Sequence, residues 1–224
     1  MPKIELKNVY KIFGEEPQSV LPLIKNGATK EEILEDTDHT VGLDNVSISV
    51  EEGETFVCMG LSGSGKSTLI RHINRLIDPT EGEVLVDGVN VLEFNEKELL
   101  ELRRHEMSMV FQRFGLFPHK TVKENVAYGL EVQDKPLEER NQTAEEQIKA
   151  VGLSGFEHQY PSQLSGGMQQ RVGLARALAT NPGILLMDEA FSALDPLIRN
   201  DMQDQLVELQ SKLHKTIVFI THDL

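Results

Sequence analysis

The run Gly60-Leu61-Ser62-Gly63-Ser64-Gly65-Lys66-Ser67 has the composition of a loop that holds phosphate. Its glycines let the backbone wrap closely around an anion, with the N–H groups pointing inward. We expect Lys66 to reach the β- and γ-phosphates of a nucleoside triphosphate and the Ser67 hydroxyl to ligate magnesium. The alternative is a glycine-rich turn with a chance lysine, but the full spacing between a strand and a helix makes that reading weak. The run therefore predicts nucleoside triphosphate binding.

A second glycine pair lies downstream, in Leu164-Ser165-Gly166-Gly167-Met168-Gln169-Gln170. Glycines with a serine at the start of a helix favour an anion, because the first backbone N–H groups have no intrahelical partner and the helix dipole is positive there. This pair has neither the lysine nor the magnesium-binding hydroxyl of the first run. Two anion sites of which one is complete suggest that two copies of the protein close around shared nucleotides.

Two acidic residues, Asp188 and Glu189, follow the apolar run Ile184–Met187. A carboxylate at the end of a buried strand can hold the magnesium shell through water, which is the role expected of Asp188. Glu189 would then polarise the attacking water as a general base. Two surface acids capping a helix are the alternative, and the apolar run before them argues against it.

Gln112 and His222 also follow apolar runs, and each is a weak signal when taken alone. Gln112 is expected to contact magnesium or the attacking water. His222 is expected to donate a hydrogen bond to the γ-phosphate. A single Gln or His at such a position is more often an ordinary polar residue.

The elements that must position these residues follow from the alternation of apolar runs with helical patterns. Strands are predicted at 55–59, 107–111, 184–187 and 217–220, and the alternation indicates an α/β fold with a largely parallel sheet. Ligands bind beyond the carboxyl ends of parallel strands, so the polar residues that follow these four strands are expected to converge.

Three further segments complete the predicted organisation. Residues 113–164 are expected to form a small helical subdomain. Residues from about 15 to 42 look like a two-helix insertion in a hairpin, with Thr29-Lys30-Glu31-Glu32 as a capping box. Asp195-Pro196 is expected to begin a helix, since Asp is a favoured N-cap and Pro a favoured first residue.

Length and composition limit the classes of protein that remain. The chain has 224 residues, 39% of them hydrophobic and 26% charged, which suits one soluble domain with a substantial core. It contains neither an apolar run of about 18 residues nor a signal peptide, so we expect a cytoplasmic protein. The net charge of −14 disfavours nucleic acid as a partner, because phosphate backbones require clustered Lys and Arg.

The order of these motifs resembles the ATPase subunits of ABC transporters over essentially the whole chain. The matching segments are Lys11-Ile12-Phe13-Gly14 as the aromatic loop, Gly60–Thr68 as Walker A, Gln112 as the Q-loop, Leu164–Gln170 as the signature, Ile184–Glu189 as Walker B, Ser192-Ala193-Leu194-Asp195 as the D-loop and His222 as the switch histidine.

The resemblance implies a P-loop NTPase fold with a RecA-like parallel-sheet core, N-terminal antiparallel β elements and an inserted helical subdomain. The chain is expected to be a single ATPase domain, with 1–112 and 165–224 as the nucleotide-binding core. It is expected to be incomplete at its C-terminus, since the family continues past the switch histidine. ATP and Mg²⁺ are the implied ligands.

The resemblance also assigns roles to residues. Phe13 is expected to stack on adenine, and Thr68 to join the phosphate loop. Ser165 and Gly167 of one copy are expected to contact the γ-phosphate held by the other in a head-to-tail dimer, and Gly166 and Asp195 are also expected to bind the nucleotide. The implied catalytic residues are Lys66, Gln112, Glu189 and His222, and the implied magnesium ligands are Ser67, Gln112 and Asp188.

A membrane permease is the implied partner, contacting residues 113–128 of this peripheral subunit at the cytoplasmic face of the membrane, with a solute-binding protein as an indirect partner. Within the family, the insertion after Gly14 and the run from Met187 to Arg199 resemble the glycine betaine/proline importers, whose ATPases usually carry regulatory CBS modules. Importers of another small polar solute such as an amino acid, and ABC ATPases that act on nucleic acid or ribosomes, are the alternatives. A nucleotide-binding regulator would be expected to lack Glu189.

Overall fold

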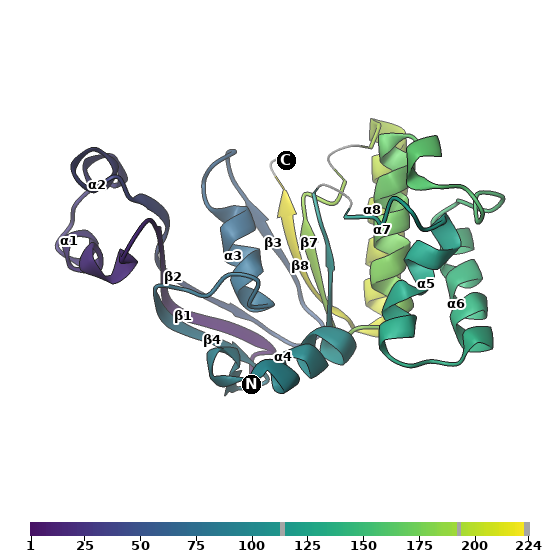
Figure 1. Ribbon diagram of the computed structural model, residues 1–224, viewed down its shortest axis with the longest axis horizontal. Coiled ribbons are helices and arrows are strands. Elements are labelled where there is room, and N and C mark those ends of the chain that lie inside the picture. The colour runs from purple at the N-terminus through teal and green to yellow at the C-terminus, as the bar shows by residue number, and fades with distance from the viewer. Residues whose placement is uncertain (113–114, 192–193, 222–224) are drawn as a thin grey trace. The chain divides into compact units, whose positions relative to one another are not determined.

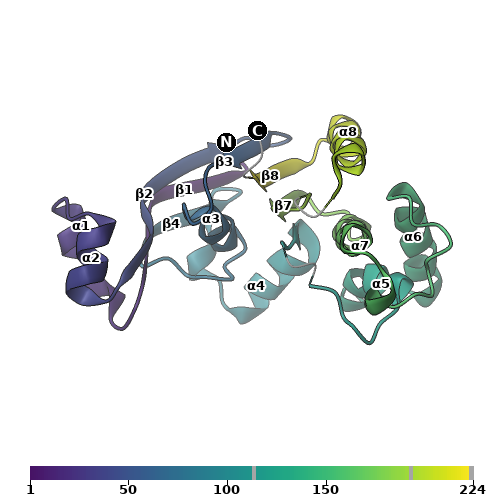
Figure 2. The same ribbon diagram turned by 90° about the horizontal axis from the view of Figure 1, so that it is seen from above.

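The computed structural model describes residues 1–112, 115–191 and 194–221. The chain forms two compact units, each with one four-stranded sheet (Figure 1, Figure 2). The first unit comprises Met1–Glu52 and Gly60–Asn95, and the second comprises Gly53–Met59 and Glu96–Leu224. The glycine loop at 60–67 therefore belongs to the first unit, and the acidic pair at 188–189 belongs to the second.

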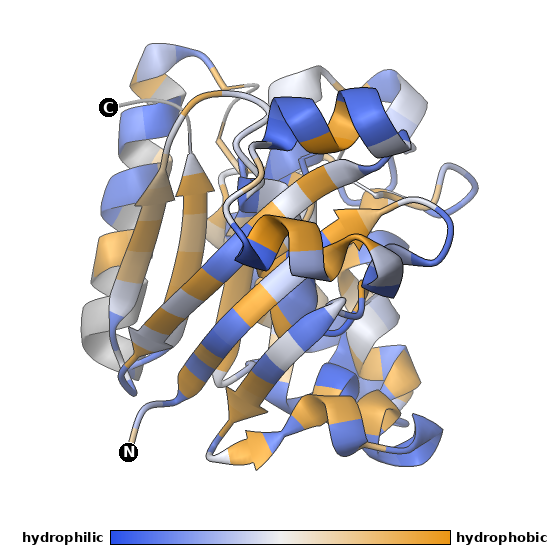
Figure 3. Cartoon of the chain, turned by 90° about the vertical axis from the view of Figure 1, so that its left-hand side faces the viewer, coloured by the Kyte–Doolittle hydropathy of each residue, from blue (hydrophilic) through white to orange (hydrophobic). Residues whose placement is uncertain are grey.

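The sheet of the first unit is antiparallel, with the strand order β2-β1-β4-β5. Its strands are β1 (Ile4–Phe13), β2 (Thr40–Val50), β4 (Glu81–Val86) and β5 (Val89–Asn90). Successive side chains of a strand point to opposite faces, so apolar and polar residues alternate along these strands (Figure 3). In β1, Ile4 and Leu6 are buried and Lys7 is exposed. The antiparallel elements expected near the N-terminus are confirmed.

A helical insertion connects β1 to β2, as the sequence predicts for residues 15–42. It consists of a 3-10 turn (Pro17–Ser19), α1 (Leu21–Lys25) and α2 (Lys30–Thr37). The predicted capping box is present: Glu32 N–H donates to Thr29 Oγ1 (3.2 Å), and Thr29 N–H donates to Glu32 Oε2 (2.8 Å). The hydrogen bond from the Thr29 backbone, aided by its hydroxyl, lowers the pKa of Glu32. The insertion packs through one apolar cluster, made of Tyr10, Ile12, Val20, Leu21, Ile24, Ile33 and Val41.

The sheet of the second unit is entirely parallel, with the order β3-β8-β7-β6. Its strands are β3 (Thr55–Met59), β6 (Met107–Val110), β7 (Ile184–Asp188) and β8 (Thr216–Thr221). These are the four predicted strands, with ends that differ by at most one residue. Strand β7 lies between β8 and β6 and is buried along its whole length, as expected for a parallel strand covered on both faces.

The second unit also contains several helices. They are α4 (Glu96–Glu101), which continues as a π-helical turn (Leu102–Glu106), α5 (Val122–Val132), α6 (Leu137–Ala150), a 3-10 turn (Pro161–Gln163), α7 (Gly166–Ala179) and α8 (Pro196–Leu213). Helix α7 packs against both α5 and α6 (Figure 2). One apolar core joins Val126, Ile148 and Val172 of these helices to Leu185 of β7.

Three of these helices can be compared with the predictions made from the sequence. Helix α8 begins at Pro196, directly after Asp195, as predicted. Helices α5 and α6 lie within 113–164, but their separation as a subdomain from a nucleotide-binding core remains a prediction. None of the helices in the described part of the chain has the length and apolar composition needed to cross a bilayer.

Candidate functional site

The glycine loop opens helix α3 (Lys66–Ile73) in the first unit. Gly63 and Gly65 have φ angles of 80° and 93°, a region that side chains disfavour. Gly65 is the N-cap of α3, and a Cβ there would collide with the carbonyl oxygen of Gly42. Leu69 and Ile70 are buried and anchor the helix. The loop therefore presents the N-terminal N–H groups of a well-packed helix, as an anion site requires.

Lys66 is folded back into this loop. Its side chain is only 7% exposed, and Nζ donates to the carbonyl oxygens of Gly60 (2.7 Å) and Leu61 (2.8 Å). These contacts hold the positive charge within the loop beside the N-terminus of α3. A phosphate oxygen carries more negative charge than a carbonyl oxygen, so it can replace either of them as the acceptor.

Phe13 lies in the same unit, at the end of β1. Its ring is 40% exposed and packs against Gly42 of β2, while Lys11 Nζ lies 5.1 Å from the ring centroid. Gly42 in turn contacts Gly65 of the phosphate loop. The structure therefore brings the predicted aromatic residue and the predicted phosphate loop together through one glycine.

The second unit brings together two other predicted residues. Gln112 follows β6, and its Nε2 donates to Glu189 Oε2 at 2.6 Å. This contact is a direct consequence of the parallel pairing of β6 with β7, which places both carboxyl ends at the same edge of the sheet. Asp188, the last residue of β7, is fully buried at this edge.

The backbone of Glu189 is held in an unusual conformation. Its φ is 50°, which is left-handed and costs a non-glycine residue about 1 kcal/mol. Glu189 N–H donates to the Ile220 carbonyl (3.0 Å), and the Glu189 carbonyl accepts from Gln170 Nε2 (3.2 Å). The Gln170 side chain is 1% exposed and comes from α7. Strain held in this way is typical of functional sites.

The second glycine pair opens α7, as the sequence predicts. Ser165 is the N-cap, and its Oγ accepts a hydrogen bond from Met168 N–H (3.3 Å). Gly166 and Gly167 form the first turn, and Ser165 and Gly166 are exposed. The start of this 14-residue helix is therefore accessible to an anion.

Parts of two predicted motifs lie outside the described residues. His222 lies outside the described residues, as do Ser192 and Ala193 of the D-loop segment, whereas Asp195 is described and exposed. Strand β3 ends at Met59, one residue before the glycine loop begins. The convergence of that loop with the ends of the other three strands stays a prediction, because the loop and those ends belong to different units.

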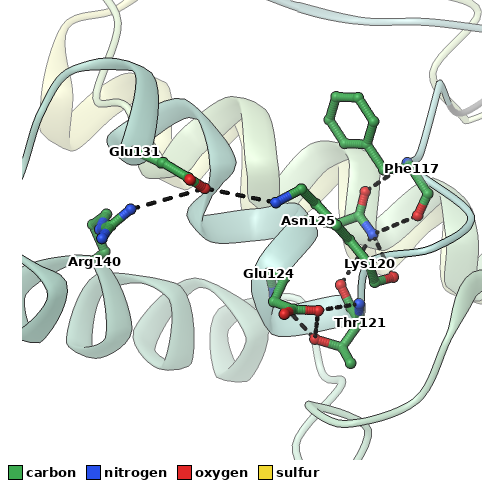
Figure 4. A network of polar contacts seen from close by, with 7 residues as sticks. All are labelled: Phe117, Lys120, Thr121, Glu124, Asn125, Glu131 and Arg140. Carbon is green, nitrogen blue, oxygen red and sulfur yellow. Dashed lines mark hydrogen bonds and ion pairs between the residues drawn. The ribbon is translucent and has the colours of Figure 1, made fainter.

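A polar network holds the segment that follows the Gln112 loop (Figure 4). Asn125 of α5 is fully buried, and its Oδ1 accepts from Phe117 N–H (2.8 Å). Its Nδ2 donates to the carbonyl oxygens of Phe117 (3.1 Å), Lys120 (2.9 Å) and Thr121 (3.0 Å). One side chain thus forms hydrogen bonds to the backbone of three residues in this turn. This turn lies within 113–128, the segment predicted to contact a permease.

Charged and aromatic groups extend this network. Thr121 and Glu124 form a capping box at the start of α5, and the hydrogen bond from the Thr121 backbone is the largest of the influences that lower the pKa of Glu124. Glu131 pairs with Lys120 (3.7 Å) and with Arg140 (3.8 Å) of α6 (Figure 4). The Phe117 ring packs on Tyr128, with centroids 4.5 Å apart.

Sequence reasoning missed Gly42, Asn125 and Gln170 as functional residues. A glycine inside a strand pattern signals a bulge or a close backbone approach, which would have singled out Gly42. Asn125 and Gln170 each stand among apolar residues on a helix face, and buried polar side chains usually satisfy a backbone group. The pattern does not say which group, because the partners are distant in sequence.

We predict that Asn125→Ala lowers the free energy of unfolding by about 3 kcal/mol, since it removes the side chain that pairs with the Phe117 N–H and the Lys120 carbonyl. Urea denaturation followed by circular dichroism measures this loss. Gln142→Ala is the matched control, because Gln142 is exposed and its amide donates to the exposed side chain of Glu146. A loss below about 1 kcal/mol for Asn125→Ala would show that the turn does not depend on this residue.

Comparisons with known proteins identify the family of this chain. The model of the ABC transporter family matches residues 43–192. The glycine betaine/carnitine transport ATP-binding protein GbuA of Listeria monocytogenes is 61% identical over the whole chain, and the glycine betaine/proline betaine transport protein ProV of Escherichia coli is 58% identical over 99% of it. The chain spans 56% of the length of each of these two relatives.

A solved structure agrees with these sequence matches. A dimeric bacterial ABC transporter cassette, MJ0796, aligns with a TM-score of 0.84 and 38% identity, covering 98% of this chain and 88% of that one. The antiparallel and parallel sheets and the helices described above are those of an ABC ATPase cassette, which confirms the predicted fold class. The chain belongs to the ABC transporter family.

Proposed function

We propose that this protein binds and hydrolyses ATP as the cassette of an importer for osmoprotectants of the glycine betaine and proline betaine type. The observation that carries the proposal is the glycine loop, which holds the nearly buried Lys66 at the N-terminus of α3. The proteins it resembles are described as ATP-binding components of such transporters.

The first unit supplies groups for the nucleotide itself. The Lys66 ammonium exchanges its two carbonyl acceptors for β- and γ-phosphate oxygens, and the N–H groups at the start of α3 complete the phosphate contacts. The exposed part of the Phe13 ring offers a surface on which adenine stacks. The first unit therefore supplies the groups that are proposed to bind the phosphates and the adenine of ATP.

The second unit supplies the groups for hydrolysis. Glu189 accepts the proton of the attacking water as general base, because it is a carboxylate at the open edge of the sheet. Gln112 donates to one oxygen of Glu189, and this hydrogen bond orients the carboxylate. Gln170 and the end of β8 hold the Glu189 backbone, so that the carboxylate keeps one orientation.

The donor atoms present suit magnesium. Ser67, Asp188 and Gln112 offer hydroxyl, carboxylate and amide oxygens, which are the ligands that this ion prefers. In the described part of the chain no group of three or more His, Cys, Asp or Glu side chains is arranged to hold a metal. Magnesium would therefore be held largely through nucleotide phosphates and water, and when bound it neutralises charge on the phosphates.

A head-to-tail dimer accounts for the second glycine pair. Ser165, Gly166 and Gly167 open an exposed helix N-terminus that lacks a lysine, so it suits the γ-phosphate held by another copy. Asp195 and His222 would belong to the same interface and site. The related cassette of known structure is described as a dimer, and another structure of it as a post-hydrolysis state with ADP and phosphate.

Transport requires partners beyond the dimer. A permease would contact the segment 113–128, whose central turn is held rigid by Asn125, and a solute-binding protein would deliver the solute to that permease. The protein would then act at the cytoplasmic face of the membrane. Methionine import proteins match only 81% of the chain, so an amino acid importer is the weaker candidate.

We predict that Lys66→Ala abolishes ATP binding, whereas Glu189→Gln keeps binding and slows hydrolysis by about 10²–10⁴-fold. The difference arises because Lys66 contacts the ground-state phosphates and Glu189 acts only while water attacks. Equilibrium binding and single-turnover hydrolysis with Mg²⁺-ATP separate the two effects. Hydrolysis at the normal rate by Glu189→Gln would refute the assignment of the base.

The shared site leads to a second prediction. Ser165→Arg and Lys66→Ala are each expected to be inactive alone, because each change damages both sites of a homodimer. In a mixed dimer, one site retains an intact serine and an intact lysine, so part of the ATPase activity should return. Verified heterodimers without any recovered activity would contradict the head-to-tail arrangement.

The identity of the transported solute can be tested by uptake measurements in cells. Deletion of the gene is expected to reduce uptake of labelled glycine betaine under salt stress, and the Lys66→Ala protein should fail to restore it. Uptake of a labelled amino acid serves as the comparison. If betaine uptake is unchanged in a strain that lacks other betaine transporters, the solute assignment is wrong while the ATPase assignment stands.

A further inference from the structure

Gly42 occupies an irregular position in strand β2. In the pairing of β1 with β2, Lys11 lies opposite Leu43 and Ile12 lies opposite Val41, so Gly42 is an extra residue without an opposite partner. Such a β-bulge bends a strand and redirects the groups around it, and bulges are common beside active sites. Here the bulge lies next to Phe13, the last residue of β1.

Both sides of Gly42 are in close contact with predicted nucleotide-binding residues. A Cβ on Gly42 would approach Phe13 Cε2 to 2.7 Å and Thr68 Cγ2 to 3.4 Å. On its other side, the carbonyl oxygen of Gly42 lies against Gly65, where a Cβ would collide with it. The absence of a side chain at both glycines therefore sets the spacing between the aromatic ring and the phosphate loop.

Lys11 is a second neighbour of the ring. Lys11 Nζ lies 5.1 Å from the Phe13 ring centroid, and the same ammonium donates to the carbonyl oxygen of Asp78 at 2.8 Å. The lysine is thus anchored while it attracts one face of the ring. With the lysine over that face and Gly42 at the ring edge, a small displacement of either neighbour changes the position of the ring.

We propose that Gly42 is a positioning residue that sets the distance from the Phe13 ring to the phosphate loop, and so determines how strongly the protein prefers ATP to inorganic triphosphate. A base stacked on Phe13 is joined through ribose to phosphates in the loop, so both ends bind at full strength only when the spacing is correct. This inference rests on the proposed ATP binding.

The test is a double-mutant cycle measured with two ligands, Mg²⁺-ATP and Mg²⁺-tripolyphosphate. Phe13→Ala should weaken ATP binding about tenfold, since it removes one stacking contact. Gly42→Ala should weaken ATP binding about fivefold, because its Cβ displaces the ring. Neither variant should change the affinity for tripolyphosphate. The double variant should bind ATP as Phe13→Ala does, because the added Cβ no longer meets a ring.

Gly183→Ala is the matched control. A Cβ at Gly183 would meet only oxygen atoms of Glu106, at an ordinary 3.6 Å, so its ATP affinity should equal that of the unmodified protein. If Gly42→Ala alone fails to fold and the double variant folds, the conflict between Cβ and ring is shown directly. If both fail to fold, the glycine acts on the backbone and the proposal is wrong.

Three other outcomes would overturn the inference: unchanged ATP affinity in Gly42→Ala, penalties that multiply in the double variant, or an equal loss for ATP and tripolyphosphate. The last result would place the effect in the phosphate loop instead of the ring. Failure of the unmodified protein to bind ATP would instead refute the proposed function, so the two failures are distinguishable.

Discussion

Parallel pairing of β3, β8, β7 and β6 is the constraint on which the candidate site depends. Every pair in this sheet is parallel, so all four carboxyl ends lie at one edge. Strand β7 is buried throughout, and its one charged residue, Asp188, is its last. Glu189 turns out of the strand immediately afterwards with a left-handed backbone, where Gln112 from the neighbouring strand end reaches it. The backbone hydrogen bonds between the parallel strands thereby determine that the side chains of Gln112 and Glu189 lie close together.

Helix N-termini supply the second recurring interaction. Helix α3 begins directly after the glycine loop, and helix α7 begins with two glycines; the first N–H groups of both have no partners within the helix. The two sites differ in one charge: Lys66 is folded into the first, whereas the second has only the capping hydroxyl of Ser165. In the proposed function, this difference suits the first site to hold a nucleotide and the second to contact the nucleotide held by another copy. Helices α2 and α5 instead carry complete capping boxes, in which threonine and glutamate side chains occupy two of the backbone donors at each N-terminus.

Three buried or close-packed residues link these features to the rest of the fold. Gln170 connects the second glycine helix to the backbone of the proposed base, and Asn125 holds the turn before α5. Gly42 allows β2 to pass between an aromatic ring and the phosphate loop. Each acts on backbone atoms or by close approach. A buried polar group without a partner costs about 1–3 kcal/mol, so such residues tolerate little change.

The sequence by itself determined the chemistry and the local elements. Short-range rules of chain geometry account for the glycine loop, the acidic pair after an apolar run, the four strands, the capping box at Thr29 and the start of α8 at Pro196. Those rules act within a few residues, so they are readable from spacing. Tertiary structure alone decided that Gln112 contacts Glu189, that Gln170 holds the same residue, and that Gly42 separates Phe13 from Gly65. These contacts join residues 19 to 77 positions apart in the polar cases. Strand order, the packing of α7 and a bulge set these contacts, and none of the three can be read from the periodicity of the sequence.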